Sequence, residues 1–560
     1  MRLEDEWTNS PFRHTVPDLD ALDQRSKFDT ATAYKHPGDL SGFDGGRRKH
    51  VCIIGGGIAG LTAAYELLGM GHEVTLLEAS NRFGGRILTH YFADGTYGEL
   101  GAMRIPRDHG CVWHYIDQFG LTTREFVGEN AAGWCLFRDA PKMRRWEWDK
   151  NWSNYYDVPP RMSPATAKHL IGQLATEAGG SLTARDWWES LSNELRAPRL
   201  KELDATAVGQ FARGIPSRFD PVLSNEEWEL AGRTVHHIWL ERCSLLHWLR
   251  EGYILDQSTK HEIVGGMDLL TREFLNRIRD LHPGALNLDA VALAIELTED
   301  LPVVTWRQGR ALEVRSETFD YVICTLPAPC TSHIRFRPEL PPRKREALSN
   351  LSYISAGKTI MRCSKRHWEL HDGIFGGTSV TDRANQQCWY PSDNLAVADE
   401  SQAAHLTVAP VFDPTRDLLD IRVELTDAAP SAYERSNSPG VFLAAYLWGT
   451  NARRFSSLND SERDDLICRS VAELHDHNDE YLEDIIHIAW DAQCNPGGGA
   501  FAFFAPGEQD RYQAALCEPL AVDNHPRVFF AGEHVGILQG WLQSSIQTAL
   551  AAVIDVLQAA

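Results

Sequence analysis

The sequence predicts an α/β fold built around a Rossmann-like nucleotide-binding domain. Residues 51–60 read Val-Cys-Ile-Ile-Gly-Gly-Gly-Ile-Ala-Gly, an apolar strand that leads through three glycines into a helix. Apolar residues then recur at helical spacing as far as Gly69 and Gly71, and residues 73–77 read as a second strand. A strand, a glycine turn, a helix and another strand form the repeating unit of a parallel sheet with helices on its faces.

The glycines of the first turn have the spacing G-x-G-x-x-G, which is typical of dinucleotide binding. Here Gly55 turns the chain, Gly57 lets a pyrophosphate approach the backbone, and Gly60 lets the helix pack on the strand. The helix begins near Ile58 and directs its free N–H groups and its positive dipole end at the phosphates. Glu78 ends the second strand, where a carboxylate binds ribose hydroxyls and argues against a 2′-phosphate.

A second pair of glycines distinguishes between dinucleotides. Gly84 and Gly85 bring another bare backbone turn toward the same phosphates, and Arg86 adds a fixed positive charge. The segment from Glu78 to Arg86 resembles the flavin-dependent amine oxidase family. This resemblance implies that the cofactor is FAD rather than NAD.

Composition limits the class of protein and its partners. A chain of 560 residues has room for two or three domains. Its formal charge of −22 argues against nucleic acid or an anionic membrane as a partner. The same negative charge suits a cationic substrate. The eleven cysteines show no C-x-x-C pairs, which indicates reduced thiols in the cytoplasm and no structural metal. The first residues lack an apolar signal core, and no apolar run reaches transmembrane length. We expect a homo-oligomer, a dimer or higher.

The resemblance extends from residue 51 to residue 550 and implies the domain organisation. It predicts a discontinuous, Rossmann-like FAD-binding domain, a mixed-sheet substrate-binding domain and a helical cap. The predicted parts are an N-terminal extension (1–46), the FAD-binding domain (47–98, 255–330 and 497–560), the substrate-binding domain (99–145 and 331–496) and the helical domain (146–254). The helical region is rich in tryptophan and also contains His236 and His237. In some relatives a histidine of this domain approaches the substrate. The more ordinary interpretation of such a pair is that both histidines pack in the domain or lie on its surface.

Two segments resemble parts of L-amino-acid oxidases that hold the substrate. Gly-Ala-Met-Arg-Ile-Pro at 101–106 matches the segment beside the flavin ring, which implies that Met103 and Arg104 contact the cofactor and that Arg104 binds the substrate α-carboxylate. A guanidinium suits a carboxylate because two parallel N–H···O bonds fix its orientation. An arginine bound to FAD or to an internal acid is the alternative. Tyr390 matches a tyrosine that donates a second hydrogen bond to the carboxylate.

Further matches concern the cofactor and the oxygen chemistry. Lys358 matches a lysine that lies near flavin N5, usually through a water molecule, and assists the reaction with oxygen; a surface salt bridge is the alternative. Residues 286–297 alternate as a strand, in which the backbone of Val291 matches the position that reaches the adenine. Residues 319–324 form a buried strand that ends before a proline.

The closing segment completes the resemblance. Glu533 matches the carboxylate that binds the ribityl chain, and Gly540 and Trp541 match the pair that offers a carbonyl to the substrate amine and an aromatic wall. Ala500 stands where relatives with covalent flavin have a cysteine, which implies non-covalent FAD. Cys494 lies six residues earlier and leaves covalent attachment as an alternative.

Together these features predict an FAD-dependent L-amino-acid oxidase that releases a 2-oxo acid, ammonia and hydrogen peroxide. Acidic overall charge and the polar residues Asp491, Gln493 and Gln539 favour a basic substrate such as L-arginine or L-lysine, whereas Trp541 and the tryptophan-rich cap suit an aromatic one. We assign no general base. Three alternatives remain: an amino-acid 2-monooxygenase, a monoamine or polyamine oxidase, and a redox-inert flavin-binding protein.

Overall fold

A computed structural model describes most of the chain. The described ranges are 37–43, 46–107, 109–155, 195–196, 198–208, 243–250, 259–297, 301–309, 313–394, 405–413, 418–426, 432–491 and 498–559. The predicted helical domain, 146–254, lies largely outside them, and so do His236 and His237. Its described helices are α5 (Arg145–Asn151), α8 (Pro198–Asp204) and α11 (Leu245–Arg250), with the 3₁₀ turn η4 (Trp152–Asn154).

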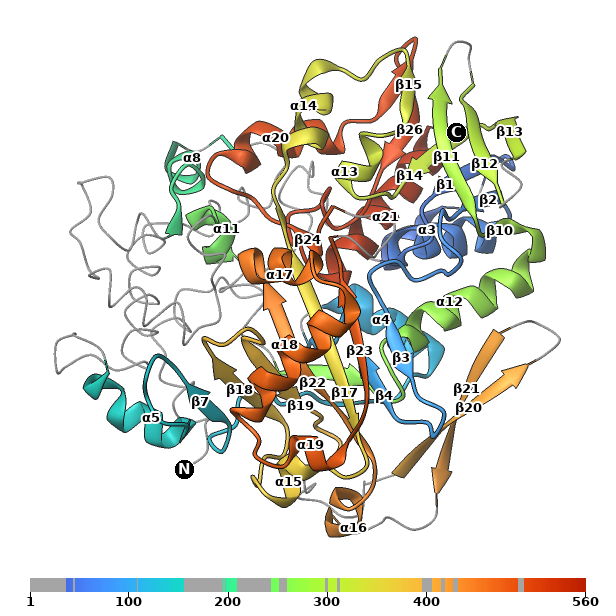
Figure 1. The fold of residues 1–560 in the computed structure, drawn as a ribbon. Helices are drawn as coiled ribbons and strands as arrows, with labels where there is room; N and C mark the ends of the chain where they lie inside the picture. Colours follow the sequence, from blue (N-terminus) through green and yellow to red (C-terminus); the bar gives the residue numbers. More distant parts are fainter. Residues whose placement is uncertain are drawn as a thin grey trace.

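A six-stranded sheet in the order β10-β2-β1-β14-β26-β25 forms the nucleotide-binding half (Figure 1). Its strands are Leu286–Asn287 (β10), Glu73–Leu77 (β2), His50–Ile54 (β1), Tyr321–Cys324 (β14), His525–Phe530 (β26) and Leu520–Val522 (β25). The first five are parallel, and β25 is antiparallel to β26. The central strands β1 and β14 are buried, as expected for a parallel sheet that is covered on both faces. The predicted pieces 47–98, 255–330 and 497–560 each contribute strands to it.

Four helices pack against one face of this sheet. They are α3 (Ile58–Gly69), α4 (Gly110–Phe119), α12 (Asp268–Leu281) and α21 (Leu542–Gln558). Their apolar side chains and those of the sheet form one continuous core. Helix α3 begins at Ile58 and strand β2 spans residues 73–77, as the sequence predicts.

The opposite face packs against a four-stranded sheet in the order β13-β12-β11-β15. Its strands are Ala290–Glu296 (β11), Val303–Gln308 (β12), Glu313–Thr318 (β13) and Arg335–Arg337 (β15). Two expectations were wrong here. The predicted strand 286–297 is two strands, because Asp289 has a left-handed φ of 51° that breaks the ladder. Strand β15, which we placed in the substrate-binding domain, pairs with β11 because Phe336 is buried in this core.

A seven-stranded mixed sheet in the order β23-β17-β22-β19-β18-β7-β8 forms the other half. Its strands are Leu482–Ala489 (β23), Ala356–Cys363 (β17), Gly440–Trp448 (β22), Gln387–Tyr390 (β19), Gly377–Thr381 (β18), Trp134–Leu136 (β7) and Met143–Arg144 (β8). Successive side chains point to opposite faces of a strand. We call the face that carries Ile360, Trp389 and Leu443 the front face, and the face that carries Met361, Tyr390 and Phe442 the back face.

The remaining elements complete the fold around these sheets. The short strands are β3 (Thr89–Tyr91), β4 (Tyr97–Glu99), β5 (Ile105–Pro106), β6 (Thr123–Glu125), β9 (Lys260–Ile263), β16 (Tyr353–Ile354) and β24 (Phe501–Ala502). The longer strands β20 (His405–Asp413) and β21 (Leu418–Thr426) pair with each other in a separate antiparallel sheet. The remaining helices are η3 (Pro37–Gly42), η7 (Pro283–Ala285), α13 (Ala328–Thr331), α14 (Pro342–Asn350), α15 (His367–Leu370), α16 (Ala432–Ser436), α17 (Gly449–Ser456), α18 (Asp460–Ala472), α19 (Asn478–Tyr481) and α20 (Glu508–Cys517). Among the described residues, none of the helices has both the length and the apolar character that crossing a membrane requires.

Candidate active site

The glycine turn between β1 and α3 forms the first part of the site. Gly55 has a φ of 109°, which only glycine adopts readily, and a Cβ on Gly60 would lie 1.9 Å from the carbonyl oxygen of Gly55. Gly57 precedes the first turn of α3, and no side chain caps that helix. The helix N-terminus is therefore open to an anion, which the positive end of the helix dipole favours.

Glu78 lies beside this turn and is already held in place. Its carboxylate accepts hydrogen bonds from the backbone N–H of Gly56 (2.7 Å) and of Ser80 (2.8 Å). The N–H of Ala290 donates to the carbonyl oxygen of Glu78 at 2.8 Å, which brings Val291, the next residue of β11, close to it. The structure thus places two predicted nucleotide contacts, 213 positions apart in the chain, side by side.

The second glycine pair closes over the first. Gly84 forms a bridge with Gly57, and its N–H donates to the carbonyl oxygen of Gly56 at 2.8 Å. Gly85 has a φ of 57°, and a Cβ there would lie 3.1 Å from the Cα of Gly57. The two bare backbone turns therefore approach each other too closely for side chains, and they leave backbone surface for a pyrophosphate.

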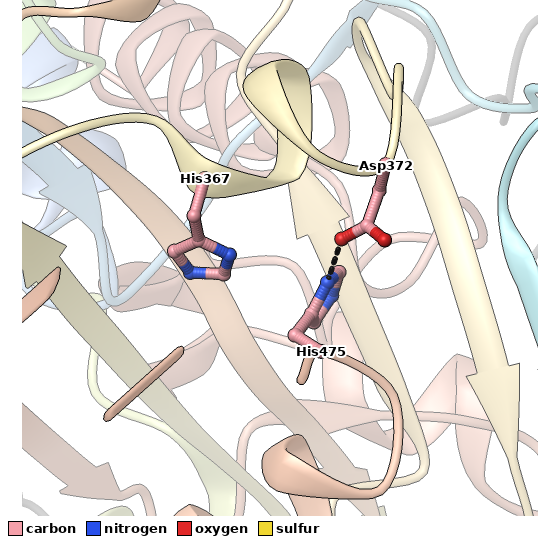
Figure 2. A group of neighbouring side chains, drawn as sticks. All are labelled: His367, Asp372 and His475. Atoms are coloured by element: carbon pink, nitrogen blue, oxygen red, sulfur yellow. Dashed lines mark hydrogen bonds and ion pairs between the residues drawn. The ribbon is translucent and has the colours of Figure 1, made fainter. Parts of the chain in front are cut away.

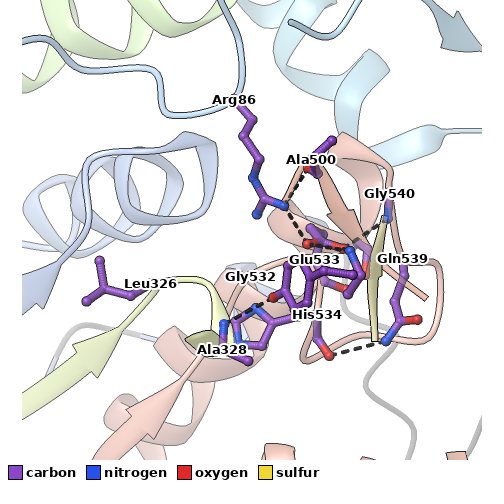
Figure 3. Close-up of polar contacts among 12 residues, drawn as sticks. Arg86, Leu326, Ala328, Ala500, Gly532, Glu533, His534, Gln539 and Gly540 are labelled. Atoms are coloured by element: carbon purple, nitrogen blue, oxygen red, sulfur yellow. Dashed lines mark hydrogen bonds and ion pairs between the residues drawn. The ribbon is translucent and has the colours of Figure 1, made fainter. Parts of the chain in front are cut away.

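Arg86 and Glu533 connect this turn to the closing segment (Figure 3). The guanidinium of Arg86 donates to the Glu533 carboxylate at 2.6 Å and to the carbonyl oxygen of Ala500 at 2.9 Å. The same carboxylate accepts from the backbone N–H of Ala502 (3.3 Å) and of Gly540 (3.0 Å). Glu533 is buried, so these three donors compensate for its lost hydration.

Two buried side-chain atoms beyond Glu533 have no hydrogen-bond partner among the described residues. His534 is 1% exposed, and within the described part of the chain its Nδ1 atom has no hydrogen-bond partner. The same holds for the amide oxygen of Gln539. Burial lowers the pKa of His534 to about 4, so the ring is neutral at physiological pH. Buried polar atoms without partners are uncommon in native proteins, and their presence here indicates a site for a polar group.

Lys358 lies on the front-face side of β17 and is buried. Its ammonium donates to the carbonyl oxygens of Gly101 (2.6 Å) and Glu99 (3.3 Å) and to the Sδ atom of Met103 (3.2 Å), and it lies 4.8 Å from the ring centre of Tyr446. The alternative reading as a surface salt bridge is therefore wrong. Burial lowers the pKa of Lys358, opposed by the nearby Glu99 carboxylate.

Glu99 is a buried acid of this site that the sequence did not indicate to us. Its carboxylate accepts from the hydroxyl of Thr89 (3.0 and 3.1 Å) and from the backbone N–H of Met267 (2.7 Å). Burial raises its pKa, and the neighbouring Lys358 opposes this shift. Glu99 directly precedes the segment that contains Arg104, and its position at the end of β4 was the available signal.

Arg104 lies against the indole of Trp389, with 5.3 Å between the guanidinium carbon and the ring centre. Among the described residues, no carboxylate forms an ion pair with Arg104, and no hydrogen bond engages its side chain. Burial lowers the pKa of Lys358 and the charge of Arg104 adds to this, whereas burial raises the pKa of Tyr446 and Arg104 opposes the rise; the three side chains therefore lie in one neighbourhood. The side chain is half-buried and electrostatically available to an anion.

Tyr390 does not share this neighbourhood. It lies on the back face, where its hydroxyl donates to the Oγ atom of Ser379 at 2.6 Å and lies 2.8 Å from the Nε2 atom of His475. The predicted hydrogen bond from Tyr390 to a substrate carboxylate is therefore not supported by its position. The physical reason is the two-residue period of a strand: Trp389, one residue earlier, faces Arg104 instead.

A row of aromatic side chains leads from Lys358 to the predicted substrate wall. Tyr446 and Trp448 lie on β22 with ring centres 5.3 Å apart, and Trp448 lies 5.8 Å from Phe501. The Phe501 ring packs against Gly540, where a Cβ would approach it to 3.1 Å. The next residue, Trp541, precedes α21, which begins without a side-chain cap. The row therefore links the two halves of the predicted site.

The other predicted residues divide between described and undescribed parts of the chain. Asp491 follows β23, and its Oδ2 atom is buried with no partner among the described residues, while burial raises its pKa. Ala500 contributes its carbonyl oxygen to Arg86. Gln493 and Cys494 lie outside the described residues, so the structure places neither of them.

The arrangement has the chemistry of a two-part site. One part offers glycine backbone, a helix N-terminus and two acids to a dinucleotide. The other part offers an unpaired guanidinium, a buried amine and aromatic walls to a small organic anion.

Comparisons with known proteins identify the family of this chain. The model of the family described as flavin containing amine oxidoreductase matches residues 58–557. The L-amino-acid oxidase of Daboia russelii is 30% identical over 519 residues, which cover 91% of this chain and 89% of that protein. The L-amino-acid oxidase of Naja atra is 29% identical and covers 91% of this chain and 88% of its own length.

Solved structures show the same fold. Putrescine oxidase bound to putrescine superposes with a TM-score of 0.64 at 18% identity, covering 91% of this chain and 99% of that one. Cyclohexylamine oxidase from Brevibacterium oxydans IH-35A gives a TM-score of 0.64 at 18% identity, covering 91% and 100%. At these identities the likeness concerns the fold alone.

Proposed function

We propose, for a chain that belongs to the flavin-containing amine oxidoreductase family, the oxidation of L-amino acids to 2-oxo acids with release of ammonia and hydrogen peroxide. One observation carries this proposal. The Arg104 guanidinium lies against Trp389 beside Lys358, and among the described residues it has no carboxylate partner. A half-buried guanidinium in this state suits the α-carboxylate of a substrate, which a simple amine lacks.

FAD is the cofactor, and the residues present fit it. The fit rests on the close approach of Gly57 and Gly85, where a Cβ on Gly85 would lie 3.1 Å from the Cα of Gly57, and on the open N-terminus of α3. Glu78 would hold the adenosine ribose, Glu533 the ribityl chain, and the N-terminus of α21 the pyrimidine edge of the flavin. Alanine at position 500 leads us to propose that the attachment is non-covalent.

The protein's own residues would bind, orient and shield the substrate. When bound, FAD accepts the two electrons that leave the substrate α-carbon and passes them to dioxygen. Arg104 would hold the carboxylate by two parallel hydrogen bonds, and the carbonyl of Gly540 would accept a hydrogen bond from the amine. Trp541 and the aromatic row Tyr446–Trp448–Phe501 would exclude water around them.

Lys358 would hold or release a proton at its Nζ atom beside the reacting centre. Three acceptors surround this atom, a number that matches the three donors of an ammonium. Burial and the charge of Arg104 lower its pKa to about 7, so both protonation states are accessible near neutral pH. A lysine in this condition can assist proton transfer when oxygen is reduced.

We further propose a basic side chain for the preferred substrate. Asp491 supports this because its Oδ2 atom is buried without a partner in the described chain, and a cationic head group would supply one. The aromatic faces of Tyr446 and Trp448 would also attract a cation. A charged head group that is desolvated without an acid costs several kcal/mol, so Asp491 is the residue on which this preference depends.

A substrate panel tests both proposals. Purified FAD-loaded enzyme is incubated with each of the common L-amino acids and, as matched controls, with agmatine and cadaverine, the decarboxylated forms of arginine and lysine. We expect peroxide, ammonia and 2-oxo acid in equal amounts from the amino acids, and little turnover of the amines. Faster oxidation of the amines would contradict the proposed class, and an amide product would indicate a monooxygenase. Faster turnover of leucine or phenylalanine than of arginine would contradict the basic preference.

A reducing cellular location and an oligomeric state are also proposals. No disulfide joins any of the ten cysteines in the described part of the chain, and burial raises the pKa of Cys388 to about 12, which keeps that thiol unreactive. Thiol titration of freshly lysed cells and light scattering of the purified enzyme test the two proposals separately.

A further inference from the structure

Three side chains from separate parts of the chain converge under the back face of the seven-stranded sheet. His367 belongs to α15, Asp372 to the turn that follows it, and His475 to the loop between α18 and α19. Their potential ligand atoms all lie within 4.8 Å of one another (Figure 2). We call these three residues the His367 cluster.

His367 is the unexplained member of this cluster. It is 1% exposed, and neither of its ring nitrogens has a hydrogen-bond partner among the described residues. Its ring packs against Trp368, His475 and Tyr481, and Figure 2 shows one ring nitrogen facing the other two members. A buried polar group without a partner destabilises the folded state, so its conformation requires a compensating interaction.

Asp372 and His475 form the other part of the cluster. Their side chains are joined by a hydrogen bond with 2.6 Å between the Nδ1 atom of His475 and the Oδ2 atom of Asp372. An imidazole nitrogen and a carboxylate oxygen are therefore already held side by side, facing His367.

We propose that His367, Asp372 and His475 bind one divalent transition-metal ion, with Zn²⁺ as the best match, in a structural site outside the active site. Two imidazoles and one carboxylate are ligands typical of Zn²⁺, with metal–ligand distances of about 2.0–2.2 Å. In a tetrahedral site such ligand atoms lie about 3.3 Å apart. When the ion binds, the distance between the Nδ1 atom of His475 and the Oδ2 atom of Asp372 lengthens slightly, and His367 moves toward this pair. The ion replaces the proton that the two atoms share.

A neighbouring amide is available as the fourth ligand. Asn478, at the start of α19, is fully buried, and both polar atoms of its side chain lack hydrogen-bond partners among the described residues. Its amide lies beside the His367 ring. The Asn478 carbonyl oxygen, or one water molecule, completes a four-coordinate site.

Two nearby cations limit the affinity without blocking the site. Lys142 is engaged by the carbonyl oxygen of Leu474 and by Asp476, and Arg144 by the carbonyl oxygen of Ala132 and the face of Trp134. Both charges are thus held by other partners. Their repulsion of a divalent ion predicts a weaker site than one made by four protein anions.

The absence of C-x-x-C pairs led us to expect no structural metal, and the proposal revises that expectation. His367 and His475 lie 108 positions apart in the chain. An ion at this site connects the α15 turn to the loop between α18 and α19. From there His475 contacts Tyr390, on the strand whose front face presents Trp389 to Arg104.

Metal content and metal-dependent melting test the site in the full-length, FAD-loaded protein. After dialysis against Zn²⁺ and removal of the excess, elemental analysis should find about one Zn²⁺ per chain. Dialysis against a strong chelator should remove it, and added ZnCl₂ should then raise Tm by a few degrees. His367→Gln and Asp372→Asn should lose both the bound ion and the Tm rise while keeping one FAD per chain.

Asp476→Asn provides the matched control, because Asp476 follows His475 directly but its side chain is 77% exposed. This variant should retain the ion and the Tm rise. Wild-type protein that holds no Zn²⁺ and shows no Tm change would overturn the proposal, whether or not the variants fold. Equal Zn²⁺ retention by His367→Gln would overturn it as well. Either result leaves the cluster as a hydrogen-bonded support for Tyr390.

Discussion

Replacing Arg104 with alanine tests the proposed substrate class most directly. In the structure this guanidinium contacts Trp389 and has no acid partner among the described residues, so its removal leaves no buried acid unpaired in the free enzyme. The free energy lost in the variant is therefore lost from the complex with substrate and not from the free enzyme. Removing one partner of a buried ion pair costs about 3–5 kcal/mol, which predicts a fall in kcat/KM of about two to four decades.

The assay is initial-rate peroxide release by FAD-loaded enzyme over a range of L-arginine concentrations. Arg107→Ala is the matched control, since Arg107 is exposed and its guanidinium lies 4.1 Å from the ring centre of Trp113. This variant should keep near-normal activity. Arg104→Lys should recover only part of the loss, because an ammonium lacks the planar two-pronged geometry.

The same variant has a second readout. Arg104 lowers the pKa of Lys358, so in Arg104→Ala that pKa should rise, and the pH profile of kcat should shift to higher pH. Near-normal kcat/KM in Arg104→Ala with FAD retained would refute the assignment of this residue to the carboxylate. An unshifted pH profile of kcat would show that Arg104 does not influence the pKa of Lys358 in the working enzyme.

Three further expectations follow. Trp389→Leu should raise KM by about 2- to 30-fold through loss of its contact with Arg104, whereas Tyr390→Phe should leave KM nearly unchanged; the reverse order would restore Tyr390 to the carboxylate site. Burial lowers the pKa of His109 to about 3 and of His534 to about 4, so both rings bind more protons in the unfolded chain. The stability that this difference contributes to the folded state is complete above pH 6.5 and is lost as the pH falls toward 4 and 3. Urea midpoints that do not fall between pH 7 and pH 5 would contradict this. Acid precipitation should release all flavin into the supernatant, and colour that remains in the pellet would refute the argument from Ala500.

The nucleotide-binding half could be predicted closely from the sequence because its determinants are local. The turn at Gly55 and the start of α3 at Ile58 depend on residues that are adjacent in the chain. The break at Asp289 was missed, because its left-handed backbone follows from the long-range hydrogen bond between Ala290 and Glu78. Alternation of apolar residues continues through such a break and does not reveal it.

The side-chain positions around the predicted substrate site were harder to predict from the sequence, for a geometrical reason. Resemblance identified the segment Trp389-Tyr390, but a shift of one residue in a strand moves a side chain to the opposite face. The His367 cluster carries no sequence signal of its own, and Glu99 carries only its position directly before the segment that contains Arg104. They depend on contacts between segments that meet only in the folded chain, as when Lys358 approaches the carbonyl of Gly101.

The path of the chain between the two large sheets sets the time at which the protein can first bind its cofactor. Strands of the nucleotide-binding sheet come from 50–77, 286–324 and 520–530, and those of the second sheet from 134–144 and 356–489. Strand β26 pairs with β14 and leads directly to Glu533, so a nascent chain lacks this acid until 209 residues beyond the end of β14 have been made. At about 5–20 residues per second, that interval lasts about 10–40 seconds. Until β26 is made, β14 lacks this partner strand, and a slow approach of β26 would favour aggregation over flavin uptake.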